Sequence, residues 1–362
     1  GFAWSPDARQ IAFSGPRVPD LSYSETADLY VVRLSDKMVR KVVATRGPDS
    51  DPHWSPDGRQ IAFRTARGQE FYYHANAGIG IVPAEGGEVK YVTPKFDENP
   101  NLVRWTKAGL YFTGLQKTEA ALFRLNPETM AYERVTPKGW MVSSVSLDEA
   151  ARTLGFSASR PNEFLEVYAT SLAEFAPKKL TAMADQYREF RLGQREVIEW
   201  KSTDGTVIEG VLIKPVDFDP QRKYPLLVVI HGGPTGIDTP SLTADRYYPI
   251  ERVVAKGALV LRPNYRGSAG YGEKFRQLNV RNLGVGDAWD VISGVDHLIA
   301  KGWVDRGRVG SMGWSQGGYI SAFLTTSSDR FKAISVGAGI SDWMTYYVNT
   351  DIHPFTRQYL KA

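Results

Sequence analysis

Two glycine-rich motifs contain the residues of this chain that are best suited to nucleophilic chemistry. The first, at residues 231–234, reads His-Gly-Gly-Pro, and the second, at residues 313–317, reads Gly-Trp-Ser-Gln-Gly. The second is a G-x-S-x-G pattern, in which the serine occupies a sharp turn between a strand and a helix. A serine hydroxyl in such a turn attacks a carbonyl carbon when a base removes its proton and hydrogen-bond donors stabilise the resulting oxyanion. The pair of motifs therefore predicts a serine hydrolase with Ser315 as its nucleophile.

The same two motifs also predict the donors of the oxyanion hole. In hydrolases with this elbow, one donor is the backbone N–H of the residue after the nucleophile, here Gln316, and the other comes from the upstream glycine turn, here Gly233. Gly313 and Gly317 leave space for the sharp turn on either side of Ser315. A helix that starts after Ser315 directs the positive end of its dipole at the site.

The second half of the chain, residues 189–362, contains the elements that would position these motifs. Apolar runs at residues 226–230, 258–261, 309–312 and 333–336 predict strands, and residues 197–213 read as a hairpin around Thr203-Asp204-Gly205. Residues 289–300 have a single apolar face and predict a helix. Strands that alternate with helices form a parallel sheet, so we expect an α/β-hydrolase fold with both motifs at strand ends.

The first half, residues 1–188, is a repeat array. Residues 2–13 read FAWSPDARQIAF and recur at residues 52–63 as PHWSPDGRQIAF, with weaker copies at residues 104–112 and 145–156. A period of about 50 residues that carries short strands is typical of β-propeller blades. The Ser-Pro-Asp-Gly turn would precede a buried strand, with the tryptophan packed between blades. We therefore expect about four blades of a partial β-propeller, an unrelated β-sandwich being the alternative.

Composition excludes several classes of function. A 362-residue chain that is 42% hydrophobic and 23% charged is long enough for two globular domains. Its net charge of +4 is spread without a basic run, so we expect no nucleic acid partner. It has no cysteine, no metal-ligand motif and no nucleotide-binding fingerprint in context, which predicts no cofactor and no metal. No apolar stretch approaches the ~20 residues of a membrane span.

Taken in order along the chain, these motifs resemble the prolyl oligopeptidase family of serine peptidases, in particular its acylaminoacyl-peptidase and dipeptidyl-peptidase-like branches. The resemblance rests on the repeats, on residues 224–234, on Asn-Tyr-Arg-Gly-Ser-Ala-Gly-Tyr-Gly at residues 264–272 and on residues 313–318. It implies a propeller that caps an α/β-hydrolase domain and restricts hydrolysis to short peptides. It also implies that Ile340, Trp343 and Tyr346 line the pocket for the residue before the scissile bond, although the same three residues would equally suit a core.

Two positions depart from the pattern of that family. Position 316 is often Tyr in the family and is Gln here, which would alter one wall of the pocket. His231 occupies a place where some members have a tyrosine that donates to the oxyanion, so a side-chain donor is not expected at this position.

The resemblance also places the acid and the histidine of the catalytic triad well downstream of the elbow, in the order Ser, Asp, His. His353 follows Ser315 too closely to fit that order, and Asp342 fits the pocket segment better than the acid position. We therefore expect the triad Asp and His to lie outside this chain. Because residue 1 is not Met and lies within a repeat, we interpret the chain as a fragment truncated at both ends, and its localisation stays open.

Three functions compete at this point. The first is a serine peptidase that hydrolyses short peptides through an acyl-enzyme on Ser315, with a propeller that gates access. The second is a carboxylesterase on the same scaffold, because a fold does not determine its substrate. The third is a non-catalytic propeller protein that binds partners. The intact elbow argues against the third, and the propeller favours the peptidase; a homo-oligomer stays open as a further partnership.

Overall fold

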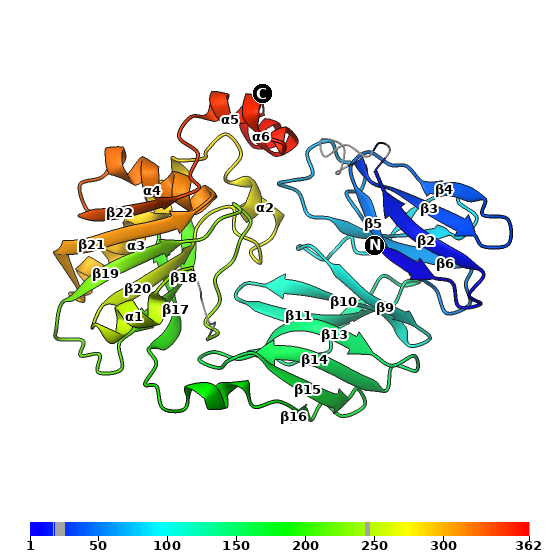
Figure 1. The fold of residues 1–362 in the computed structure, drawn as a ribbon, viewed down its shortest axis with the longest axis horizontal. Helices are drawn as coiled ribbons and strands as arrows, with labels where there is room; N and C mark the ends of the chain where they lie inside the picture. Colours follow the sequence, from blue (N-terminus) through cyan, green and yellow to red (C-terminus); the bar gives the residue numbers. More distant parts are fainter. Residues whose placement is uncertain (17, 19–25, 243–246, 362) are drawn as a thin grey trace. The chain divides into compact units, whose positions relative to one another are not determined.

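The computed structural model describes residues 1–16, 18, 26–242 and 247–361, which form two compact units (Figure 1). The first unit comprises Gly1–Ala158, Val167–Thr181 and Asp351–Gln358, and the second comprises Ser159–Glu166, Ala182–Thr350 and Tyr359–Ala362. A single domain boundary between residues 188 and 189 stays a prediction. No helix within the described ranges is long and apolar enough to cross a membrane.

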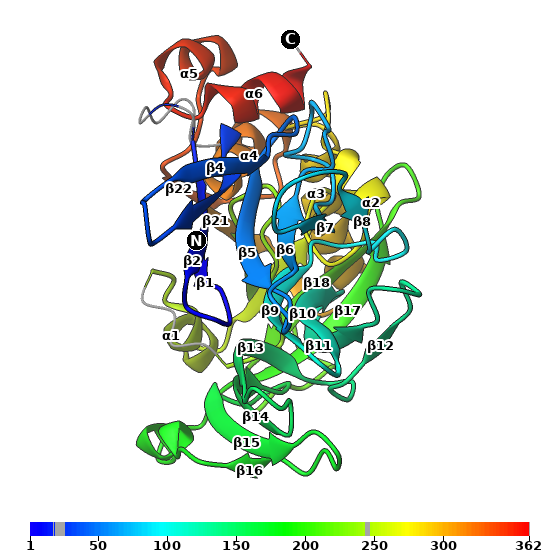
Figure 2. The same cartoon turned by 90° about the vertical axis from the view of Figure 1, so that its right-hand side faces the viewer.

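The first unit consists of antiparallel strands that pair in chain order. The described strands form the sheets β1-β2-β3-β4 and β5-β6-β7-β8, and a third sheet in which β9–β12 and β13–β16 are joined by a single parallel bridge between Ala120 and Met141. Strands β13 to β16 lie side by side in both views (Figures 1 and 2). The strands are β1 (Phe2–Trp4), β2 (Gln10–Gly15), β3 (Asp28–Arg33), β4 (Val39–Val43), β5 (Asp49–Trp54), β6 (Gln60–Thr65), β7 (Gly78–Pro83), β8 (Lys90–Tyr91), β9 (Asn101–Thr106), β10 (Gly109–Gln116), β11 (Glu119–Leu125), β12 (Tyr132–Arg134), β13 (Met141–Leu147), β14 (Thr153–Ser159), β15 (Glu166–Ser171) and β16 (Lys178–Lys179). Meanders of about four strands, repeated, are propeller blades.

The sequence repeat is a repeated turn. In the second copy the Ser55 hydroxyl donates to Asp57 Oδ1 (2.6 Å) and accepts from the backbone N–H of Gln60 (2.9 Å). The first copy makes the same two bonds with Ser5, Asp7 and Gln10. These side chains fix the hairpin that leads into β2 and β6, so the repeated residues build the turn.

The tryptophan of the first repeat and that of the second lie in different environments. Trp54 is 7% exposed and its indole N–H donates to the carbonyl oxygen of Ala3 (3.0 Å), which joins the second sheet to the first. The expectation that this tryptophan packs between blades is confirmed there. Trp4 instead is 53% exposed, so that expectation is wrong for the first copy.

The second unit contains a mixed sheet with the order β17-β18-β20-β19-β21-β22. The hairpin β17–β18 pairs antiparallel with β20, and the strands from β20 to β22 are parallel. The strands are β17 (Gln194–Lys201), β18 (Val207–Lys214), β19 (Tyr224–Ile230), β20 (Leu259–Asn264), β21 (Val304–Trp314) and β22 (Ala333–Gly337). The helices are a 3-10 helix (Met183–Tyr187), α1 (Ile250–Ala255), α2 (Glu273–Gln277), α3 (Gly286–Ala300), α4 (Gln316–Ser327), α5 (Trp343–Asn349) and α6 (His353–Leu360), the last divided between the two units.

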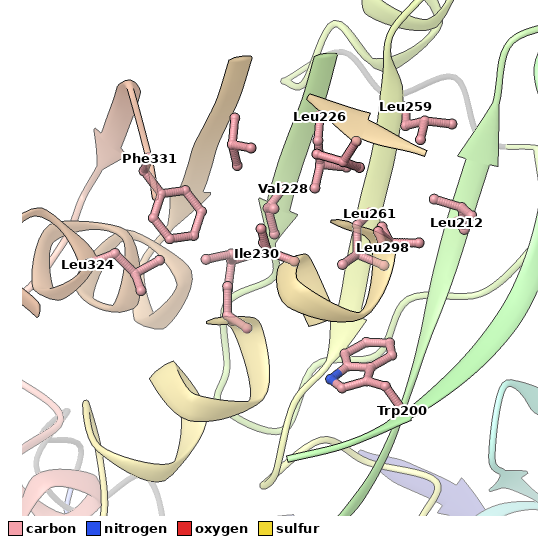
Figure 3. Close-up of a cluster of buried hydrophobic side chains, with 14 of the residues drawn as sticks. Trp200, Leu212, Leu226, Val228, Ile230, Leu259, Leu261, Leu298, Leu324 and Phe331 are labelled. Carbon is pink, nitrogen blue, oxygen red and sulfur yellow. The ribbon is translucent and has the colours of Figure 1, made fainter. Parts of the chain in front are cut away.

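Helices cover both faces of this sheet. On one face Leu226, Val228 and Ile230 of β19 pack with α3 and α4, as Figure 3 shows with Leu298 and Leu324. On the other face Val229, between them in sequence, packs against α1. Apolar residues on both faces explain why β19 reads as a continuous apolar run, since side chains alternate along a strand. The expected α/β-hydrolase sheet with helices between its strands is therefore present.

The pairing of β19 with β21 brings the two motifs together. These strands are parallel, and Ile230 at the end of β19 pairs with Gly313 near the end of β21. The carboxyl ends of neighbouring parallel strands lie at the same edge of a sheet, which is where α/β folds place their ligands. Residues 231–234 and Ser315 therefore leave the sheet side by side.

Candidate active site

Ser315 occupies the strained turn that the sequence predicts. It lies between the end of β21 at Trp314 and the start of α4 at Gln316, with φ 58° and ψ −121°, and its side chain is exposed. Its backbone N–H donates to the carbonyl oxygen of Gly337 on β22 (3.0 Å), and its own carbonyl accepts from the N–H of Tyr319 (2.9 Å). A non-glycine residue at positive φ costs free energy that the surrounding structure must offset, and such residues gather at functional sites.

The glycines of the elbow are required by close packing. A Cβ on Gly317 would collide with the carbonyl oxygen of Ile230, and a Cβ on Gly313 would collide with the carbonyl group of Gly317. A Cβ on the next residue, Gly318, would collide with the carbonyl oxygen of Gly337. The first turn of α4 can thus approach the ends of β19 and β22 only without side chains at these positions.

Gly317→Ala should therefore unfold or displace the start of α4. We expect a loss of about 3 kcal/mol or more in the free energy of unfolding, because the added methyl group meets backbone atoms that cannot move alone. Chemical denaturation measures the loss. Gly155→Ala on β14 is the matched control, since nothing lies within 4 Å of its Cβ position. A Gly317→Ala protein as stable as that control would contradict the packing argument.

The glycine turn after β19 lies against Ser315. A Cβ on Gly232 would lie 3.2 Å from Ser315 Cβ and 3.8 Å from Ser315 Oγ. The next residue, Gly233, has φ 136°, a conformation that side chains rarely adopt. The structure thus places the predicted upstream donor in the turn that borders the nucleophile.

His231 is turned into the protein and away from a donor role. It is 9% exposed, and its ring lies parallel to that of Tyr265, with the ring centroids 4.5 Å apart. Its Nδ1 lies 2.8 Å from the Gly232 carbonyl oxygen and its Nε2 lies 3.0 Å from Ser268 Oγ. Burial lowers the pKa of the imidazole. One ring nitrogen thus contacts the turn and the other contacts the segment after β20, so His231 ties the glycine turn to that segment.

Gln316 combines an available backbone donor with a buried side chain. As the first residue of α4 it has a backbone N–H without a partner inside the helix. Its side chain is 1% exposed, and Nε2 donates to Asp287 Oδ2 on α3 (3.2 Å). The side chain of Gln316 therefore points inward, beneath the elbow.

The three predicted pocket residues lie around α5. Trp343 and Tyr346 are half-buried neighbours with ring centroids 5.9 Å apart, and Trp343 also meets Tyr319 of α4 edge-on at 5.1 Å. Ile340 is half-buried in the segment between β22 and α5. The structure brings Trp343 against α4, the helix that follows the nucleophile, and Tyr346 against Trp343. Their role as a pocket stays a prediction.

The two downstream residues that could complete a triad have other positions. The Asp342 carboxylate accepts from the backbone N–H of Thr345 (2.7 Å) and caps α5, and this bond lowers the pKa of Asp342. His353 begins α6 and belongs to the first unit. Among the residues that the structure describes, no side chain makes a hydrogen bond to the hydroxyl of Ser315. That the triad Asp and His lie outside this chain stays a prediction.

Sequence reasoning missed a buried charged cluster behind the site. Arg266, 2% exposed, donates through Nε and an NH₂ group to Asp290 (2.9 and 2.7 Å) and also pairs with Asp204 (2.9 Å). Burial opposes the charge on Arg266, but hydrogen bonds to Asp290 and Asp204 raise its pKa above the ordinary value. The only sequence signal was that Arg266 lies in the Asn-Tyr-Arg-Gly-Ser segment.

Asp287 is the second carboxylate that the sequence did not reveal. It is fully buried in the first turn of α3, and its Oδ1 accepts from the backbone N–H groups of Gly284 and Ala288 (both 2.8 Å). Burial, and then the nearby charge of Asp290, raise its pKa to about 7. No cation pairs with it among its described contacts.

This raised pKa predicts how stability depends on pH. The folded protein holds the Asp287 proton to about pH 7, whereas the unfolded chain releases it near pH 4, so the stabilisation is complete below pH 4 and is lost as pH rises to 7. Asp287→Asn has no such proton to lose. Relative to the native protein, its free energy of unfolding should therefore rise by about 2–4 kcal/mol as the pH increases from 4 to 8. Denaturation at pH 5 and 8 measures the gain. The control is Asp296→Asn, which changes a more exposed carboxylate of the same helix that pairs with Arg330. Parallel pH profiles for the native and Asp287→Asn proteins would contradict it.

Comparisons with known proteins agree with this architecture. Residues 247–362 match the model described as prolyl oligopeptidase family. The chain is 29% identical to the uncharacterized peptidase YuxL of Bacillus subtilis over 69% of this chain and 38% of that protein. It is 25% identical to dipeptidyl-peptidase 5 of Porphyromonas gingivalis over 97% of this chain and 52% of that protein. The chain thus spans about half the length of dipeptidyl-peptidase 5.

Solved structures share the fold. An acylaminoacyl peptidase of Pyrococcus horikoshii aligns over 99% of this chain and 55% of its own, with a TM-score of 0.82 and 23% identity. A puromycin hydrolase aligns over the whole chain and 56% of its own, with a TM-score of 0.75 and 20% identity. The chain therefore has propeller blades followed by an α/β-hydrolase domain, as the sequence predicted.

Proposed function

We propose that this chain, a member of the prolyl oligopeptidase family, carries the nucleophile and the oxyanion hole of a serine peptidase that acts on short peptides. Ser315 Oγ forms a bond to the carbonyl carbon of the scissile peptide while a base takes its proton. The C–N bond then breaks, the amine leaves with that proton, and an acyl-enzyme ester remains. Water hydrolyses the ester and restores the serine hydroxyl.

The observation that carries the proposal is the geometry of Ser315. The residue is exposed at φ 58° between β21 and α4, and the Gly232–Gly233 turn borders it on the other side. The backbone N–H groups of Gly233 and Gln316 then hold the oxygen that becomes negative in the tetrahedral intermediate. In this proposal the general base and its acid partner lie outside these 362 residues.

Two observations support peptides as the substrate class. Relatives of about twice this length bear the names dipeptidyl-peptidase and acylaminoacyl peptidase, and one structure is titled as a complex with Z-Gly-Gly-Phe-chloromethyl ketone. In this chain Trp343 packs against Tyr319 on α4, the helix that follows Ser315, and Tyr346 packs against Trp343. We infer that Ile340, Trp343 and Tyr346 accept an apolar or aromatic residue before the scissile bond.

A fluorophosphonate probe tests the nucleophile and a substrate panel tests the class. The protein to test is the proposed enzyme, in which residues 1–362 are joined to the part that supplies the base; we call it the natural-length protein. It should be labelled once, at Ser315, and its Ser315→Ala variant should not be labelled. Blocked peptide anilides that end in Phe should be hydrolysed faster than anilides that end in Asp, and faster than casein. Equal labelling of the two proteins would overturn the nucleophile, and rapid hydrolysis of simple esters without peptide hydrolysis would favour the carboxylesterase.

A further inference from the structure

The inward side chain of Gln316 connects the predicted oxyanion donor to a buried carboxylate. Its Nε2 donates to Asp287 Oδ2 at 3.2 Å, and both side chains are essentially inaccessible, at 1% and 0% exposed. Asp287 is itself held by two backbone N–H groups, those of Gly284 and Ala288. The contact therefore joins the first residue of α4 to a rigidly held group at the start of α3.

A second contact from the same face of α4 reaches the same segment. Tyr319 lies three residues after Gln316, so both side chains leave the same side of the helix. Its hydroxyl donates to the carbonyl oxygen of Leu283 (3.3 Å), and a Cβ on Gly284 would collide with that hydroxyl. The first turn of α4 is thus attached at two points to residues 283–288.

We propose that Asp287 is a positioning residue for the oxyanion hole, which fixes the backbone N–H of Gln316 by holding the Gln316 side chain. This inference rests on the proposed function, because it assigns a purpose to the N–H of Gln316. The backbone N–H and the held side chain share one Cα, so holding the end of the side chain at Asp287 limits how far the main chain of Gln316 can shift. Oxyanion donors act only within hydrogen-bond distance of the developing charge.

A buried glutamine suits a buried acid that changes its protonation state. The amide N–H donates to the Asp287 carboxylate, and after a half-turn of the amide its carbonyl accepts from the protonated acid. In the observed arrangement Gln316 Oε1 is buried without a hydrogen-bond partner. After the half-turn, Nε2 would lack a partner instead, so each arrangement leaves one amide atom without a hydrogen bond. The contact to Asp287, and with it the position of the donor, survives the change in protonation.

The charged and titratable groups around Asp287 come from three elements. Asp290 on the same helix raises the pKa of Asp287, and the Arg266 guanidinium pairs with Asp290. Tyr265 and Tyr319 face Asp287 from the segment after β20 and from α4, and the charge of Asp287 raises the pKa of both phenols, after the larger effect of burial. None of these groups replaces the Gln316 amide as a partner of Asp287 Oδ2 in the described contacts.

Steady-state kinetics of variants in the natural-length protein test this inference. Asp287→Ala should lower kcat about 10–100-fold with KM nearly unchanged, less than the 10²–10³-fold effect of removing an oxyanion donor outright. Asp287→Asn should keep kcat within about 3-fold, because its amide can still bind both backbone N–H groups and the Gln316 carbonyl. Asp287→Ala should add little in a Gln316→Ala background, since the two side chains act as one unit. Asp296→Ala, on the exposed side of α3, is the control.

The outcomes separate the inference from the function on which it rests. If the native protein shows no hydrolysis that Ser315→Ala abolishes, the proposed function fails. If that hydrolysis is present and Asp287→Ala has native kcat, or Asp287→Asn is as impaired as Asp287→Ala, the positioning role alone is overturned. If Asp287→Ala does not fold, infrared spectra decide: the acid C=O band that Asp287→Asn removes should shift when a phosphonate on Ser315 fills the hole. An unchanged band would overturn the inference.

Discussion

Ser315→Ala should lower kcat of the natural-length protein on a short peptide anilide by about 10⁶-fold, the effect of removing a triad serine in subtilisin. The reason is that no other group can form the acyl-enzyme, so only the oxyanion hole and substrate binding remain. KM should change little, because the serine hydroxyl contributes mainly to the transition state. Initial rates over a range of anilide concentrations measure both parameters.

The matched control for this substitution is Ser321→Ala, which removes a buried hydroxyl from the same helix. Ser321 is fully buried on α4 and its Oγ has no hydrogen-bond partner. Its removal should leave kcat within about 2-fold, since surrounding contacts lose only one atom. A Ser315→Ala protein that keeps more than about 1% of native kcat would show that another residue is the nucleophile.

The sequence predicted the elements of the site where the signal was local. The apolar run of β19 and the glycines around Ser315 are local features, because strand burial and elbow packing restrict residue types at fixed offsets. The helix expected at residues 289–300 begins three residues earlier, at Gly286. Its first turn contains Gly286 and Asp287, which have no apolar periodicity and so gave no signal.

The features that the sequence could not predict depend on contacts between distant segments. Asp287 and Gln316 meet across two helices, and nothing near Asp287 in the sequence distinguishes it from an exposed helix-start carboxylate. The burial of His231 against Tyr265 likewise depends on how residues 264–272 fold back on the glycine turn. The expectation that Gln at position 316 alters one wall of the pocket followed from the family pattern, and the structure directs this side chain to Asp287 on α3.

A protein that consists of residues 1–362 alone should hydrolyse the same anilide at least about 10³-fold more slowly than the natural-length protein. The proposal takes the general base from outside this chain, and a serine hydroxyl without a base stays protonated at neutral pH. The oxyanion hole and substrate binding still act, so a residual rate above that of water is expected. β22 adds a second reason: among the described strands it lies at the edge of its sheet and is largely exposed, which favours association of strand edges.

Activity and size measured on the same sample check this prediction. Size-exclusion chromatography separates monomer from aggregate, and the anilide rate of the monomer fraction is compared with that of the natural-length protein at equal concentration. A monomer with native turnover would contradict the expectation and would identify a base within these residues. His353 and Asp342 would then be the first to substitute. His353→Ala should abolish that activity if His353 is the base. Asp342→Asn keeps an oxygen acceptor for the Thr345 N–H, so it should lower the activity only if Asp342 is the acid.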